Sequence, residues 1–231
     1  MRFHLDQLTS QTSWLRATGT CVVVATLAVL SPATMCWSDV AVITASVDGD
    51  IESDGTIDDS SIFSQTQQGG GGVDTRNIFE FDLSSIPAGA IITSVEFSGH
   101  TTLNAGNGTL NLSDYVGTGP PQISVADYSV AGNLVATVTG GIDFFSTHDF
   151  AFMLSDISNA QLAADTTEII GLRGDMTSFG DTWRVASLEQ TTRKLPTLTV
   201  NYARIPEPSA ACVLLLGLCT TGLHRRRSKS P

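Results

Sequence analysis

The sequence predicts an all-β fold, an antiparallel β-sandwich, because its central part consists of short strand-like segments separated by turns. In residues 39–203, brief apolar or alternating segments are separated by clusters of Gly, Ser, Thr, Asn and Asp. Turn signals that recur every dozen or so residues are typical of antiparallel sandwiches. This region has no helical stripe of useful length and no internal repeat, so we expect a single domain.

Alternating side chains assign the strands and their buried faces. Residues 78–83 place Phe and Leu at the odd-numbered positions, which predicts an aromatic face turned inward and Glu80 turned to solvent. Pro87 and Gly89 then favour a turn, and the next strand, 91–97, should bury its odd-numbered side chains. Further strands are expected at 40–47, 109–112, 134–138, 150–154, 168–172, 184–188 and 195–202, with one short helix at 155–162.

The first 38 residues have the features of a secretory signal peptide. Two arginines precede an apolar core at residues 21–30, and Pro32 ends this core. Cleavage after Ser38, or after Cys36, would place small residues at the positions where signal peptides require them. We therefore expect this segment, residues 1–38, to direct the chain into the secretion translocon and then to be removed.

The last segment, residues 204–231, contains three parts in a fixed order. They are a Pro-Glu-Pro motif, an apolar run and an arginine cluster, formed by Pro206, Glu207, Pro208, residues 210–223, Arg225, Arg226 and Arg227. As a helix, the apolar run would cover about 21 Å, less than the ~30 Å hydrocarbon core of a bilayer. A helix held transiently in the membrane fits this length better than a permanent anchor, which is the alternative. The arginines would keep the far end on the cytoplasmic side.

This order of parts resembles the PEP-CTERM sorting signal. The resemblance implies that an exosortase-type enzyme in the membrane reads the tail and removes it. Such signals occur in Gram-negative bacteria that make exopolysaccharide. The resemblance therefore also implies an exported protein of the cell envelope, located on the outer surface or in the extracellular matrix.

Two stretches of the central region resemble a second family, the DNRLRE-type jelly-roll domains. Residues 76–95, RNIFEFDLSSIPAGAIITSV, are similar to one motif of that family. Residues 186–189 (ASLE) and 195–202 (LPTLTVNY) are similar to its closing motif. The resemblance covers about residues 40–203 and implies a jelly-roll-like sandwich. Because relatives include carbohydrate-binding modules, it also implies carbohydrate binding as a candidate function.

Charge and composition argue against several functions for residues 39–203. The whole chain has a net charge of −11, and this region has 21 Asp and Glu against five Lys and Arg, a formal charge of −16. Such a domain repels nucleic-acid backbones and anionic lipid surfaces. It contains none of the four cysteines, so it has neither a disulfide framework nor a thiol nucleophile. With no Gly-x-Ser-x-Gly motif and no phosphate-binding loop either, we expect no enzymatic activity.

Alternating acids near the start of the domain form the best candidate for a metal site. Started at Asp50, their spacing matches positions one, three, five and nine of an EF-hand-like calcium loop, although Ser61 stands where an acid should complete the coordination. The alternative is the solvated acidic edge of a strand. Calcium is the one cofactor that the sequence indicates, with Asp48, Asp50, Glu52, Asp54 and Asp58 as its candidate ligands.

The remaining candidates are isolated aromatic and histidine residues. Tyr128 and Trp183 could stack on sugar rings, or they could be ordinary core residues. His148 and Asp149 could begin an acid–base pair, for which His100 is the only other histidine of the domain. Taken together, the sequence predicts a secreted β-sandwich with a structural role at the cell surface or in the matrix, associated with exopolysaccharide. The alternatives are a calcium-assisted carbohydrate-binding module and a polysaccharide-degrading enzyme.

Overall fold

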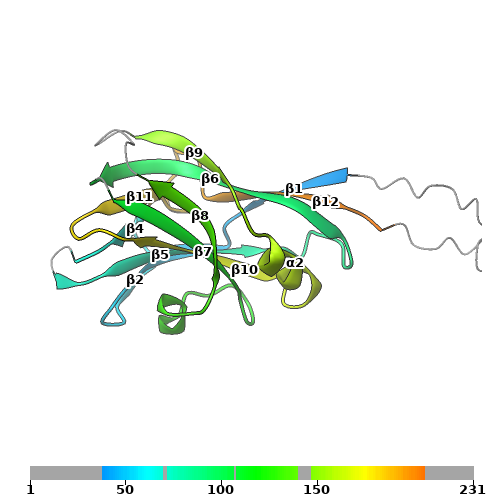
Figure 1. The fold of residues 1–231 in the computed structure, drawn as a ribbon, viewed down its shortest axis with the longest axis horizontal. Coiled ribbons are helices and arrows are strands. Elements are labelled where there is room, and N and C mark those ends of the chain that lie inside the picture. Colours follow the sequence, from blue (N-terminus) through cyan, green and yellow to red (C-terminus); the bar gives the residue numbers. More distant parts are fainter. Residues whose placement is uncertain (1–37, 70–71, 107, 140–146, 206–231) are drawn as a thin grey trace, which may run out of the picture. The chain divides into compact units, whose positions relative to one another are not determined.

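The computed structural model describes residues 38–69, 72–106, 108–139 and 147–205 (Figure 1). Its strands are β1 (Ser38–Thr44), β2 (Val47–Glu52), β3 (Ile57–Asp58), β4 (Phe63–Gln67), β5 (Thr75–Asp82), β6 (Ile91–Ala105), β7 (Thr109–Val116), β8 (Asn133–Thr139), β9 (His148–Met153), β10 (Ile169–Met176), β11 (Thr182–Ala186) and β12 (Thr197–Ala203). A 3-10 helix at Val125–Tyr128 and the short α-helix α2 (Ser158–Asp165) complete the description. Residues 1–37 of the predicted signal peptide and the predicted sorting motif, Pro206, Glu207, Pro208, residues 210–223, Arg225, Arg226 and Arg227, lie outside the described residues.

These strands form one antiparallel sheet that curls on itself (Figure 1). Its main path runs β1-β12-β6-β11-β4-β5-β10-β7-β8, while β2 pairs with β5 and β9 pairs with β6. The long strand β6 pairs with β12 along its first part and with β11 along its second. It therefore connects the two limbs of the curl, one formed by β1 and β12 and the other running from β11 to β8. The prediction of a mainly β, antiparallel fold with one short helix is thereby confirmed.

Aromatic rings fill the space between the two limbs. Phe97 of β6 lies 5.3 Å from Phe79 and 6.1 Å from Phe81, both on β5, measured between ring centroids. Phe150 of β9 lies 5.3 Å from Phe97 on another side. Because β5 and β6 are not neighbours in the sheet, Phe79 and Phe81 meet Phe97 across the inside of the curl, whereas Phe150 lies on β9, which pairs with β6. Tilted and edge-to-face ring pairs of this kind stabilise a core beyond the area they bury.

The opposite face of β5 is buried as well, and this corrects the expectation for Glu80. The chain between β7 and β8 folds over that face, and Glu80 is buried beneath it. Its carboxylate accepts hydrogen bonds from the hydroxyl of Tyr115 at 3.0 Å and from the backbone N–H of Gln122 at 2.7 Å. The prediction that Glu80 faces solvent is wrong, because alternation along a strand does not reveal a loop that covers its second face. A small apolar cluster of Ile51, Ile78, Tyr115 and Ile123 surrounds this network.

Most predicted strands are present with shifted ends, and three differences have clear causes. The expected strand 40–47 is two strands, because the chain leaves β12 after Thr44 and joins β5 as β2. In β6, Thr93 is an extra residue between the pairs Ser94–Asn201 and Ile92–Tyr202. This β-bulge reverses the alternation, so Ile92 is buried and Ile91 exposed, contrary to the prediction. Strand β4 was not predicted, because its mainly polar residues show no apolar face.

The described domain begins and ends at neighbouring positions. Strands β1 and β12 pair along their full length, from Ser38 opposite Ala203 to Thr44 opposite Thr197. Just beyond this pairing, the guanidinium of Arg204 forms an ion pair with Asp39, with Nε and Oδ2 2.6 Å apart. Both ends of the domain therefore leave the sheet side by side.

Candidate functional site

The predicted calcium loop folds as a β-hairpin. Strand β2 carries the first acids, a turn follows, and β3 returns beside β2 with Asp58 opposite Asp50. Asp54 lies in the turn, where its Oδ1 accepts a hydrogen bond from the backbone N–H of Thr56 at 2.9 Å. Gly55 adopts a φ of 92°, which glycine allows at little energetic cost. The acids therefore belong to a strand pair and not to a helix-flanked loop.

Two of these acids point into the domain. Asp48 is only 4% exposed, and its Oδ2 accepts a hydrogen bond from the backbone N–H of Leu188 at 3.1 Å. Asp50 is buried too, and its Oδ2 accepts one from the backbone N–H of Gln65 at 3.1 Å. Both lie on the same face of β2 because side chains two residues apart share a face. The alternative of a solvated acidic edge is therefore wrong for Asp48 and Asp50.

The five candidate ligands do not converge on one point. In the described part of the chain, no group of three or more His, Cys, Asp or Glu side chains is arranged to hold a metal ion. The hydrogen bonds explain why: Asp48 and Asp50 turn inward to backbone donors, whereas Asp54 and Asp58 cap turns at Thr56 and Ser60. The calcium site stays a prediction, and the geometry does not support its proposed ligand set.

Burial changes the acid–base chemistry of the inward-facing carboxyls. It raises the pKa of Asp48 to about 7, and the nearby charge of Glu189 adds to the effect. Burial likewise raises the pKa of Asp50 to about 6. Asp48 lines a cavity of about 270 Å³ together with Asp59, Gln122 and Glu189. Its Oδ1 has no hydrogen-bond partner within the described residues, so the domain holds at least one carboxyl that titrates near neutral pH.

Calcium and magnesium should stabilise the protein equally, because carboxylates that do not converge can be screened but not chelated. The measurement is the melting temperature of the purified protein with each ion at the same concentration. Asp50→Asn combined with Asp54→Asn should leave the effects of the two ions equal to each other. A larger rise with calcium that this double variant abolishes would contradict the expectation and restore the predicted calcium loop.

The two aromatic residues considered for sugar contact lie in different clusters. Trp183 is 2% exposed in the main core, and its Nε1 donates a hydrogen bond to Oγ1 of Thr101 at 3.1 Å. This burial does not support the contact between Trp183 and a sugar ring, which stays a prediction. Tyr128 packs against the smaller cluster, and the guanidinium of Arg76 covers one face of its ring at 4.2 Å from the centroid.

Asp149 pairs with a histidine other than its sequence neighbour. It lies opposite His100 in the β6–β9 pair, and His100 Nδ1 is 2.6 Å from Asp149 Oδ1. This hydrogen bond is the main reason why the pKa of Asp149 is below its usual value. The other ring nitrogen, Nε2, is buried and finds no hydrogen-bond partner among the residues that the structure describes. The imidazole of His100 is therefore buried while Asp149 is exposed, and the pair connects two neighbouring strands.

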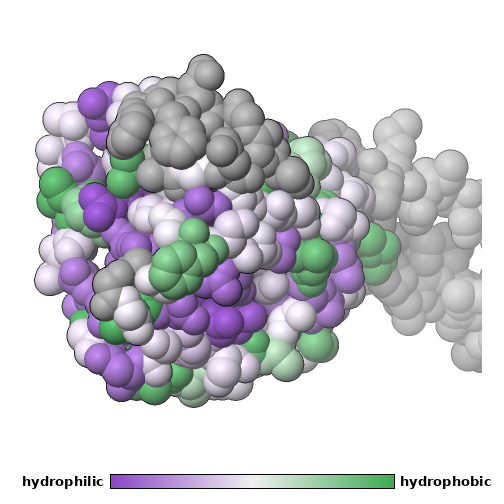
Figure 2. Space-filling model, turned by 60° about the vertical axis from the view of Figure 1, so that its left-hand side comes forward, coloured by the Kyte–Doolittle hydropathy of each residue, from purple (hydrophilic) through white to green (hydrophobic). Residues whose placement is uncertain are grey.

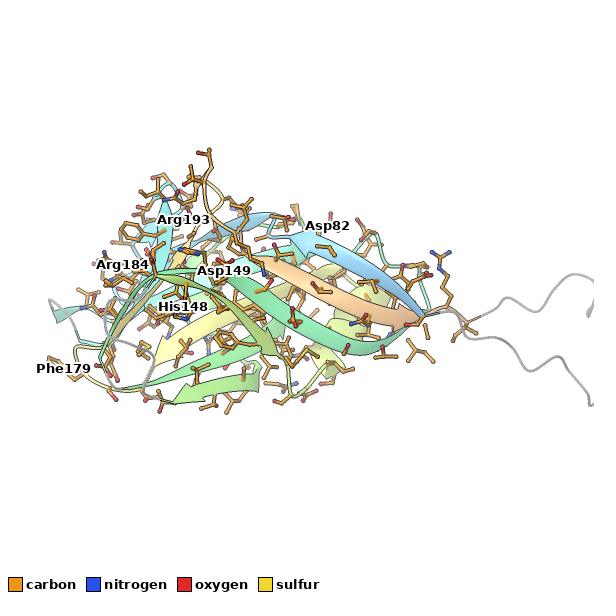
Figure 3. All side chains as sticks on the ribbon, turned by 90° about the horizontal axis from the view of Figure 1, so that it is seen from above. Asp82, His148, Asp149, Phe179, Arg184 and Arg193 are labelled. Carbon is orange, nitrogen blue, oxygen red and sulfur yellow. The ribbon has the colours of Figure 1, made fainter. Side chains whose placement is uncertain are left out.

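A feature that the sequence analysis missed is an exposed aromatic residue in a turn. Phe179 lies between β10 and β11 and is 83% exposed, more than any other large hydrophobic residue in the described ranges. Figure 3 shows it projecting from the end of the domain opposite to the end of β12. The signal in the sequence was a single Phe between Ser178 and Gly180, where turn residues otherwise predominate.

Comparisons with known proteins do not assign the chain to a family. No protein-family model matches it, and no curated protein is significantly similar to it. Across the described ranges, no helix has the length and apolar character needed to cross a bilayer. The function is therefore inferred from the motifs in the sequence and from the geometry of the domain.

Proposed function

We propose that the chain is an exported, non-catalytic protein of the cell surface or extracellular matrix, processed through its C-terminal segment and associated with exopolysaccharide. The observation that carries this proposal is the order of the three parts in the last segment, residues 204–231. The Pro-Glu-Pro motif, the apolar run of residues 210–223 and the arginine cluster follow one another directly after the domain. We interpret this segment as a PEP-CTERM sorting signal that enters the membrane as a helix before an exosortase-type enzyme removes it.

The boundaries of the folded domain support this interpretation. The sheet begins at Ser38, where the signal peptide is expected to be cut, and its last strand ends at Ala203, just before Pro206. Cleavage after Ser38 would keep Asp39 and its ion pair with Arg204. Removal of residues 1–38 and of the tail from Pro206 onward would therefore keep the β1–β12 pairs from Asp39–Tyr202 to Thr44–Thr197, as expected for signals that are cut from a finished domain.

We further propose that the curled sheet is a jelly-roll-like sandwich of the DNRLRE type. The residues that resemble the first motif of that family, 76–95, form β5, the following turn and the start of β6. Their phenylalanines meet Phe97 across the curl. Of the residues that resemble the closing motif, 197–202 lie in β12, which pairs with β6. Carbohydrate binding is the second candidate function, favoured by the exposed aromatic turn at Phe179.

Variants of the sorting signal test the proposal. Glu207→Ala, or deletion of Arg225, Arg226 and Arg227, should trap uncut precursor in the membrane fraction. Each change alters one of the three parts of the tail that the exosortase-type enzyme is proposed to recognise. Glu189→Ala is the matched control, since Glu189 is an exposed acid of the folded domain. Immunoblots of membrane and extracellular fractions provide the measurement. Normal processing of both signal variants would refute the sorting role.

A further inference from the structure

Strand β1 leaves one of its two edges unpaired. It ends the main path of the sheet and, among the described strands, pairs with β12 alone (Figure 1). The hydrogen bond from Ala45 N–H to the carbonyl of Pro196, at 2.9 Å, continues this pairing and fixes its phase. Because hydrogen-bonded positions alternate in an antiparallel pair, the odd-numbered residues of β1 turn their backbone groups to β12. The even-numbered residues, Val40 and Val42 among them, turn theirs to the other edge, the free edge of β1.

The chain itself shows that a strand can bind along this edge. Ser46, the next even-numbered residue after Thr44, donates its backbone N–H to the carbonyl of Glu80 on β5 at 2.7 Å. From there on, β5 pairs with β2, which continues the line of β1. No described strand takes the same place along β1. Unpaired backbone groups on an edge strand are a template for a further strand.

The side chains of Val40 and Val42 are exposed together with their backbone groups. They lie on the outer face of β1 and are 57% and 70% exposed. Lysine and proline, which commonly protect edge strands from association, are absent from β1. Its one charge, on Asp39, is compensated by the ion pair with Arg204. The free edge therefore presents two β-branched side chains and no uncompensated charge.

The order of the side chains makes this edge complementary to itself. If two copies of β1 pair antiparallel about Ala41, Val40 of each copy lies directly opposite Val42 of the other. This register also joins even-numbered to even-numbered residues, whose backbone groups β12 does not use. A shift by two residues would leave one valine opposite Ser38 or Thr44. A shift by one would oppose residues whose backbone groups are already bound to β12. The edge thus favours one two-fold symmetric register, in which cross-strand valine pairs stabilise the contact.

The remaining surface does not favour unspecific association. On the face of the domain that Figure 2 shows, hydrophobic residues form separate patches among polar ones, whereas broad apolar patches mark unspecific contact surfaces. Residues 39–203 have a formal charge of −16, so two copies repel each other. Added salt should therefore strengthen a contact through the free edge, because it screens this repulsion.

We propose that the exported chain binds a second copy of itself through the free edges of β1, so that one sheet continues through both domains. The pairing needs only residues 40–42 and persists whether the signal peptide is cut after Cys36 or after Ser38. One strand pair is a small interface of the transient class, but copies delivered to the same surface or matrix reach high local concentrations. The inference goes beyond the proposed sorting role and gives the protein a means of connecting its copies.

Sedimentation velocity of the secreted protein, from about 10 μM to about 1 mM, tests the proposal. The mass should shift from that of one chain toward that of two. Val40→Lys combined with Val42→Lys should weaken association at least about tenfold, because each lysine faces a lysine of the other copy. Val40→Lys combined with Val42→Glu should retain it, because each lysine then faces a glutamate. Val125→Lys, at an exposed apolar position of the 3-10 helix, is the matched control and should leave association unchanged.

A single cysteine tests the position of the symmetry axis. Residues 39–203 contain no cysteine, so Ala41→Cys introduces the only thiol of the processed chain. At the axis, the two Cα atoms would lie about 4.5 Å apart, which a disulfide can bridge. Oxidation should link Ala41→Cys into a covalent dimer but leave Val125→Cys as single chains.

A single-chain mass at every concentration would overturn the proposal, as would a dimer that survives both lysines. Equal losses in the Lys/Lys and Lys/Glu variants would overturn the antiparallel register, provided that equal melting temperatures show both to be folded. Failure of the sorting role gives a different result. An uncut apolar tail adds its own mass to each chain, and association through it would not respond to changes at Val40 and Val42.

Discussion

Replacing Phe97 by alanine should lower the free energy of unfolding by about 3–5 kcal/mol, a large part of the ~5–15 kcal/mol that stabilises a typical domain. Phe97 is fully buried, and three aromatic rings, Phe79, Phe81 and Phe150, surround it within 5.3 to 6.1 Å. The substitution removes apolar contacts between the two limbs of the sheet and leaves a cavity that both limbs share. Urea denaturation followed by fluorescence would measure the loss.

The matched control is Phe179→Ala, which removes the same atoms from an exposed position. It should change the free energy of unfolding by no more than about 0.5 kcal/mol, as is usual for surface substitutions. An equal loss from both variants would contradict the packing described for β5, β6 and β9, because it would mean that Phe97 contributes no more burial than a surface side chain.

The protein should lose stability as the pH rises from about 4 to about 7. Burial raises the pKa of Asp48 to about 7, from 3.8 for an ordinary aspartate. Between these values the folded state holds a proton that the unfolded state has released, so each pH unit lowers the stability by about 1.4 kcal/mol. The stability that protonated Asp48 contributes is fully present below pH 4 and is lost above pH 7, a change on the order of 4 kcal/mol. Asp50 and Asp114, each raised to about pKa 6 by burial, act in the same direction.

Asp48→Asn isolates this effect from that of other carboxyls. The amide oxygen can still accept the hydrogen bond from the backbone of Leu188, but the side chain no longer titrates. Melting temperatures between pH 4 and pH 8 should therefore fall less steeply in the variant than in the original protein. Exposed groups with lowered pKa values, such as Asp54 and Asp82, stay ionised across this range and are the same in both proteins. Identical slopes would mean that Asp48 is ionised throughout this range.

The alternation of apolar and polar side chains was sufficient to locate most strands. It could not reveal features that depend on contacts between distant parts of the chain. The odd-numbered aromatic residues of β5 are buried as predicted, because one face of that strand lines the core whatever covers the other. The second face is covered by the segment after β7, and no pattern near Glu80 indicates this. The bulge at Thr93 likewise depends on the register with β12, which lies about a hundred residues further along the chain.

The candidate site shows the same limit for polar residues. Acids at alternating positions were recognised as a unit, yet the hydrogen bonds that turn Asp48 and Asp50 inward come from Leu188 and Gln65. These donors lie on other strands and loops, so spacing alone could not separate a metal loop from buried carboxyls. Phe179 was missed for the converse reason: its exposure depends on how two turns meet at one end of the sheet.

If the tail is a removable sorting signal, it should be absent from the native extracellular protein, and the intact mass of that protein measures this. We expect a mass that corresponds to a chain beginning near Asp39 and lacking both the apolar run, residues 210–223, and the arginine cluster. The sheet itself, which ends at Ala203, should be complete. A mature protein whose mass includes every residue through Pro231 would contradict the account and leave the tail as a short permanent anchor.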